Sequence, residues 1–133
     1  MLQPAGWAQA RGLAHGVLAS GQMVFVAGML GADEQGRLVD GFVAQARQAL
    51  RNIVTVIAEA GGLPQHIVRL TWYVCDMDEY LSQRIALGVA YREVMGRHFP
   101  AMAVVEVKRL VQRDARLEIE ATAVLPCDGT NKK

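Results

Sequence analysis

Two stretches in the last third of the chain alternate between apolar and polar residues, and they constrain the fold most strongly. They predict β-strands over residues 101–108 and 116–124, joined by a polar connection that contains Gln112, Arg113 and Asp114. Side chains alternate between the two faces of a strand. One face of the second strand is therefore apolar throughout and is expected to belong to the core: Leu117, Ile119, Ala121 and Ala123.

Glu120 lies on the opposite face of this strand, with small or apolar residues around it in the sequence. A carboxylate at such a position is either a solvated charge on a sheet face or a buried acid that can take part in chemistry. The alternating pattern alone favours the solvated charge. Glu120 is nevertheless the candidate for catalytic work.

The composition suits one domain over residues 1–133, with residues 1–12 as a lead-in and residues 126–133 as a less ordered tail. Hydrophobic residues make up 52% of the chain and charged residues 20%. This balance indicates that some apolar surface is buried between subunits. A formal net charge of +1, with scattered lysines and arginines, does not predict a nucleic-acid partner.

Metal ligands and membrane segments are not expected either. The two cysteines, Cys75 and Cys127, and the three histidines, His15, His66 and His98, have no metal-ligand spacing, and the cysteines suggest no disulfide framework. No segment approaches the roughly 20 apolar residues of a membrane span, and the first residues lack the apolar run of a signal peptide. We therefore expect a soluble, cytoplasmic protein.

The remaining patterns predict an α+β fold with two layers. Two helices would cover one face of a mixed sheet of five or six strands. The first helix is expected to have Asp40 as its N-cap, and the second to be capped by Asp76 or Asp78 and to run to Gly96 with Met77, Leu81, Ile85 and Val89 along one stripe. The expected elements are a hairpin of residues 15–18 and 22–28, a short strand at 37–39, a helix over 40–60, a strand over 67–75, a helix over 76–96, and the two strands above.

The sheet face without helices is expected to be too apolar for water. We assign to it Met23, Phe25, Ala27, Met29, Met102, Val104 and Glu120. Packing against a neighbouring subunit would remove this surface from solvent. The sequence therefore predicts a homo-oligomer.

Several motifs between Gly12 and Val124 resemble those of the Rid family of reactive intermediate deaminases, also known as the YjgF family. They are VFVAGML, QARQALRNI, AGG followed by IVRLTWYV, FPAM with VEV, and LEIEATAV. The resemblance implies a chorismate-mutase-like fold and a homotrimer with ligand clefts at its three subunit interfaces. It also implies hydrolysis of enamines or imines to 2-oxo acids and ammonia, without metal or organic cofactor.

The resemblance carries over only partly at the implied site. Met102 stands where the family's imine deaminases have the arginine that grips the substrate carboxylate, and Val104 stands in place of a cysteine. Ala27 replaces a serine and Ala14 a tyrosine, whereas Gly28 and Glu120 match the family. Glu120 is thus the implied catalytic residue. The implied substrate-binding positions are Ala14, Ala27, Gly28, Met29, Met102 and Val104.

Two functions remain open at this stage. One is an enzyme that hydrolyses a reactive C=N or enamine compound, with Glu120 as acid and base and with Met102 and Val104 selecting a less anionic substrate. The other is a non-catalytic trimer that binds a small metabolite or a protein partner in the same cleft. Arg109, Arg113 and Arg116 are close enough in sequence to replace the missing arginine, but a solvated loop is the simpler interpretation of the connection they occupy. The endoribonuclease activity assigned to some family members has no support here, because the sequence lacks a basic patch with interleaved aromatic residues.

Overall fold

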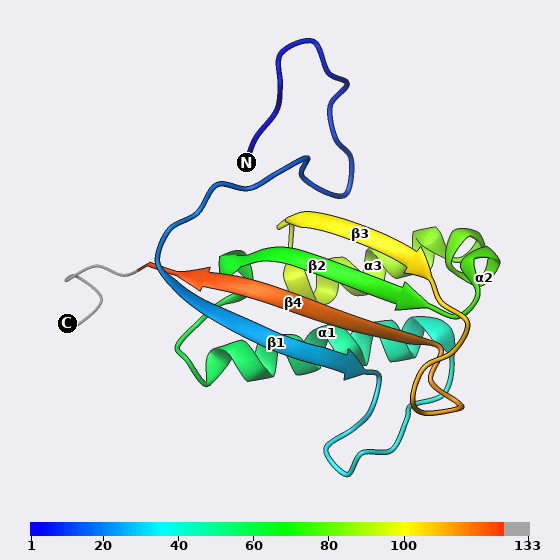
Figure 1. Cartoon of the computed structure of the whole chain (residues 1–133). Coiled ribbons are helices and arrows are strands. Elements are labelled where there is room, and N and C mark those ends of the chain that lie inside the picture. Colours follow the sequence, from blue (N-terminus) through cyan, green and yellow to red (C-terminus); the bar gives the residue numbers. More distant parts are fainter. Residues whose placement is uncertain (127–133) are drawn as a thin grey trace.

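A computed structural model describes residues 1–126 of the chain, and residues 127–133 of the predicted tail, Cys127 included, lie outside these described residues. The strands lie side by side in one sheet, with the helices behind it (Figure 1). The mixed α+β architecture agrees with the sequence prediction. The elements are β1 (Gln22–Leu30), α1 (Phe42–Ala58), the short 3-10 helix η1 (Pro64–His66), β2 (Ile67–Val74), α2 (Met77–Ser82), α3 (Arg84–Met95), β3 (Ala101–Glu106) and β4 (Leu117–Leu125).

The sheet has four strands in the order β1-β4-β2-β3, so the prediction of five or six strands was wrong. β4 is antiparallel to both β1 and β2, and β3 runs parallel to β2. The predicted strand over residues 15–18 does not form a hairpin with β1. The N-terminal segment instead passes beside β3, where Ala14 forms an isolated bridge with Ala101, and the chain then crosses to begin β1 at the opposite edge (Figure 1). The predicted strand over residues 37–39 is reduced to one bridge between Ala32 and Leu38.

Helix α1 packs its apolar stripe on the sheet, as its periodicity predicted. It begins at Phe42 with Gly41 at the N-cap, so the assignment of Asp40 to that position was wrong. Gly41 has a φ of 99°, which is a backbone conformation that glycine adopts without strain. The buried residues recur at helical spacing: Phe42, Gln45, Ala46, Ala49, Leu50, Ile53 and Ile57.

The predicted second helix is interrupted at Gln83 and forms α2 and α3. Of the stripe expected along this helix, Met77 packs against the core, whereas Ile85 is 88% exposed and Leu81 and Val89 are exposed as well. The side chains that α3 buries are Leu87, Ala90, Tyr91 and Met95. The bend at Gln83 therefore gives α3 its own direction and its own buried face.

Asp76 caps α2, as predicted. Its Oδ1 accepts hydrogen bonds from the backbone N–H groups of Asp78 at 3.0 Å and Glu79 at 3.2 Å. Removing such a cap typically costs about 1 kcal/mol. We expect Asp76→Ala to lower the free energy of unfolding by about this amount in urea titrations. An unchanged unfolding midpoint and slope would contradict the capping role.

The two faces of the sheet carry different residues, and part of the sequence assignment was wrong. Met102 pairs with Leu70 and Val104 with Trp72, and both side chains pack against the core on the helix-covered face. Met29 also packs against the core, because the register of β1 shifts between Val26 and Met29. We call the other side the open face. It comprises Met23, Phe25 and Ala27 of β1, Arg69, Thr71 and Tyr73 of β2, Ala101, Ala103 and Val105 of β3, and Glu118, Glu120, Thr122 and Val124 of β4.

Candidate active site

Glu120 lies near the middle of β4 on the open face, where it is exposed to solvent in the single chain. On one side it pairs with Thr71 of β2. The hydroxyl of Tyr73 donates a hydrogen bond to Glu120 Oε1 at 3.0 Å. This bond is the main reason that the pKa of Tyr73 is raised, since ionising the phenol would place two negative charges side by side. Glu120 is therefore a solvated carboxylate with one fixed partner.

On its other side, Glu120 faces the irregular part of β1. Val26 pairs with Ala121 and Met29 with Ile119, so Ala27 and Gly28 both lie opposite Glu120 in a β-bulge. A Cβ atom at Gly28 would collide with the carboxylate end of Glu118. Glycine at this position thus leaves room for the Glu118 side chain beside the bulge.

A separate pocket of about 520 Å³ lies on the helix-covered side, between the β3 edge and the helices α2 and α3. Met102 and Val104 line it, together with Gly12 and Leu13 from the N-terminal segment. Ala14 is buried next to this segment, and its N–H donates to Pro100 O at 3.0 Å. The other lining residues are Arg11, Trp72, Tyr80, Arg84, Leu87, Gly88, Tyr91, Arg92 and Phe99.

One chain therefore separates the predicted site residues into two groups. Ala27, Gly28 and Glu120 lie on the open face, whereas Met102 and Val104 line the pocket on the other side of the sheet. Sequence reasoning missed the contribution of α3 to this pocket. The available signal was the spacing of Arg84, Gly88 and Arg92, which places them on one helix face four residues apart. The sequence analysis followed only the apolar stripe of Leu81, Ile85 and Val89 along this helix and did not use that signal.

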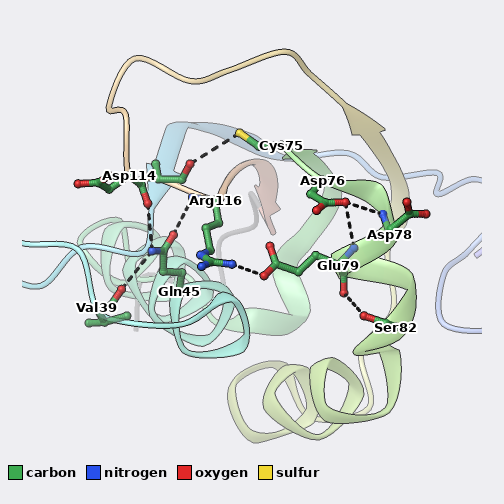
Figure 2. Close-up of polar contacts among 10 residues, drawn as sticks. Val39, Gln45, Cys75, Asp76, Asp78, Glu79, Ser82, Asp114 and Arg116 are labelled. Carbon is green, nitrogen blue, oxygen red and sulfur yellow. Dashed lines mark hydrogen bonds and ion pairs between the residues drawn. The ribbon is translucent and has the colours of Figure 1, made fainter.

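The three arginines proposed to replace the missing guanidinium lie elsewhere. Arg109, Arg113 and Arg116 line a different pocket, of about 830 Å³, between the loop after β3 and the loop before α1. The side chain of Arg116 forms an ion pair with Glu79 (Figure 2). Within one chain, none of the three lines the pocket of Met102.

The buried side chain of Gln45 holds these two loops together. Its amide donates to Val39 O at 3.1 Å and to Asp114 O at 3.5 Å, and its oxygen accepts the Arg116 backbone N–H at 2.9 Å (Figure 2). Cys75 also contacts this loop, since its thiol donates to Ala115 O at 3.6 Å. Burial raises the pKa of Cys75, which does not favour a reactive thiolate. We therefore assign this region a structural role.

Within residues 1–126, no three histidine, cysteine or acidic side chains form a group that could hold a metal ion. His66 Nδ1 instead accepts the Leu63 N–H at 2.9 Å, and His98 Nε2 lies 2.6 Å from Ile67 O. Both rings thus hydrogen-bond to backbone groups, His66 within its own turn and His98 to the start of β2. Over the same described residues, we find no helix with the length and apolar character required to cross a membrane.

Comparisons with known proteins place this fold in a family. The family described as Endoribonuclease L-PSP matches residues 8–125. A RutC family protein of Haemophilus influenzae is 37% identical over 105 residues, which cover 78% of this chain and 80% of the relative. The chain belongs to the Rid (YjgF) family. Another Rid relative, the 2-iminobutanoate/2-iminopropanoate deaminase of Salmonella typhimurium, is 34% identical over 108 residues, which cover 78% of this chain and 80% of that protein.

A solved structure supports the same assignment to the Rid family. The conserved Rid family protein YyfB of Yersinia pestis has a TM-score of 0.82 and 28% identity, with 93% of this chain and 96% of that chain covered. The Rid fold therefore extends over nearly all of this chain. The predicted family resemblance is confirmed.

Proposed function

We propose that this Rid protein is a cofactor-free hydrolase that converts a reactive imine or enamine into a carbonyl compound and ammonia, at a site completed between the subunits of a homotrimer. The observation that carries the proposal is the position of Glu120, on the open face of the sheet, hydrogen-bonded to Tyr73 and opposite the Ala27–Gly28 bulge. The deaminase named above is a relative at 34% identity and supports the same reaction class.

The open face supports assembly. Phe25 is 72% exposed and Met23 57% exposed, and Val105 is an exposed large apolar residue of the same face. Large apolar side chains exposed at both edges of one sheet face favour an interface on that face. Covering this face with another copy of the chain would remove Glu120 from bulk water. It would also allow a pocket with Met102 to meet the Glu120 of a neighbour, which one chain cannot do.

The proposed chemistry uses one water and no redox step. The Glu120 carboxylate accepts a proton from water as the water oxygen forms a bond to the imine carbon, and the C=N bond becomes a C–N single bond. The proton is then returned to nitrogen, which gives a carbinolamine. Glu120 next moves the hydroxyl proton of the carbinolamine to its nitrogen, so that the C–N bond breaks and a C=O bond forms as ammonia leaves. An enamine enters the same route after protonation at carbon gives the imine. The Tyr73 hydroxyl orients the carboxylate through its hydrogen bond.

A non-catalytic trimer that binds a small metabolite is the second candidate. The observation that favours it is the replacement of four polar groups at the implied site by Ala14, Ala27, Met102 and Val104. Such a protein would use the same cleft. It would hold its ligand without turnover.

Ammonia release separates these candidates. Imines and enamines generated freshly from several amino acids would be mixed with the protein, with a chelator present, and ammonia would be measured against the spontaneous reaction. The proposal expects acceleration for at least one compound. No acceleration for any of them, with a folded trimer present, would favour the binding protein.

A further inference from the structure

The pocket between β3 and α3 carries an excess of positive charge. Arg11, Arg84 and Arg92 line it, and no aspartate or glutamate does so among the described residues. No ion pair joins any of these three guanidinium groups to a carboxylate within residues 1–126. The loop pocket differs, since Asp40, Glu79 and Asp114 accompany its arginines. The β3–α3 pocket therefore has unpaired cations and suits an anionic ligand.

Gly88 makes room for one of these cations. Arg84, Gly88 and Arg92 follow one another every four residues along the face of α3 that borders the pocket. Helical side chains lean toward the N-terminus, so Arg92 reaches back over Gly88. Its Nη1 lies 3.4 Å from the position of a Cβ atom at residue 88. Glycine is unfavourable inside a helix, and here its missing side chain leaves space beside the Arg92 guanidinium.

Trp72 supplies a second, independent indication of a ligand. It is 3% exposed and lines the same pocket. Its Nε1 is a buried donor without a hydrogen-bond partner in the part of the chain that the structure describes. Buried polar groups are nearly always paired, and an unpaired one requires an explanation. An acceptor atom on a bound molecule would satisfy this donor.

The remaining walls are apolar. Leu87 and Tyr91 from α3 face the β3 side, where Met102 and Val104 lie, and Phe99 stacks on Tyr91 with a centroid distance of 5.3 Å. Flat unsaturated groups bind well to such surfaces. The pocket thus combines aromatic and aliphatic walls with guanidinium groups on the side formed by α3.

We propose that Arg84 and Arg92 bind the carboxylate end of a planar, unsaturated substrate, and so replace from α3 the guanidinium that is missing at Met102. The chain would thus keep a carboxylate-bearing imine or enamine as its substrate, with the guanidinium groups supplied by α3 in place of the β3 position, in contrast to the less anionic substrate predicted from Met102 alone. This inference rests on the proposed function for the reaction, but the anion site itself is independent of turnover.

Calorimetric titration with crotonate, an unreactive unsaturated carboxylate, and with its neutral amide crotonamide tests the inference. Arg92→Gln, Arg84→Gln and the double variant would be compared with Arg97→Gln, a control arginine that is exposed and outside the pocket. Losing a charge-assisted hydrogen bond should weaken crotonate binding by roughly tenfold to 150-fold in each single variant. Crotonamide binding should change little, and the control should match wild type.

Three results would overturn the inference: no crotonate binding by the wild-type protein, equal binding by wild type and the double variant, or an equal loss in Arg97→Gln. Because all three arginines are exposed, the variants are expected to keep their fold, which circular dichroism would check. Arginine-dependent binding without ammonia release would leave the anion site standing and reject the proposed reaction. Ammonia release with an unchanged KM in the double variant would support the proposed reaction and reject the anion site.

Discussion

Glu120→Gln is expected to lower the rate of ammonia release by about 10²–10⁴-fold while the protein keeps its fold and assembly. Glutamine has nearly the same shape and can still accept the hydrogen bond from Tyr73, but it cannot take a proton from water. The measurement pairs initial rates of ammonia release with sedimentation and thermal unfolding of the same preparations.

Glu118→Gln is the matched control, because Glu118 lies on the same strand and the same face, two residues away. Its effect on the rate should be small. A Glu120→Gln protein that assembles normally and retains full turnover would exclude Glu120 as the acid and base. In that case the carboxylate would be only a charge on the sheet, and its neutralisation could raise the unfolding temperature of the assembly.

Phe25→Asp is expected to dissociate the proposed trimer and to abolish turnover with it. Phe25 projects from the open face and is 72% exposed in the single chain, so the substitution disturbs few contacts within the subunit. In an assembly that buries this face, the same change would place a charge in an apolar interface and remove a large contact. Sedimentation at micromolar concentration should then give a species near 14.5 kDa.

Ile85→Asp provides the comparison for this variant. Ile85 is 88% exposed and belongs to α3, on the helix side of the sheet. The Ile85→Asp variant should leave the assembly intact. A trimer that survives Phe25→Asp, or a wild-type protein that is itself a monomer, would remove the basis for a site shared between chains.

Sequence patterns predicted the parts of the fold in which one periodicity runs without interruption. The stripe of α1 and the alternation of β2 and β4 each specify a buried face, and the structure confirms all three. Errors arose where a local feature changes the phase. The extra residue at Ala27–Gly28 turns Met29 into the core, and the interruption at Gln83 changes the face that α3 buries.

The same errors limited the prediction of the site. Glu120 was placed correctly on the face opposite to the Leu117 stripe. Met102 and Val104 were assigned to that face as well, because alternation alone does not tell which face of β3 meets the helices; its register with Leu70 and Trp72 decides this. The apolar stripe read through Leu81, Ile85 and Val89 is exposed, and the sequence analysis gave Arg84 and Arg92 no role. Long-range pairing and helix phase thus decide the site, and neither is local in sequence.

The central claim is that one subunit supplies the pocket and another supplies Glu120, and mixed assemblies test it most directly. Gly88→Trp would fill the pocket from an ordinary helical position, where a Cβ atom meets only Arg92. We expect this variant and Glu120→Gln each to be inactive alone.

Co-refolding the two variants in equal amounts distributes them at random in trimers. Each site then has one chance in two of an intact pocket and one in two of an intact Glu120, so about a quarter of the wild-type rate of ammonia release should return. Recovery near this value is the result the account predicts. A mixture no more active than the sum of its two parents, although sedimentation shows mixed trimers, would place the complete site within one chain and contradict the account.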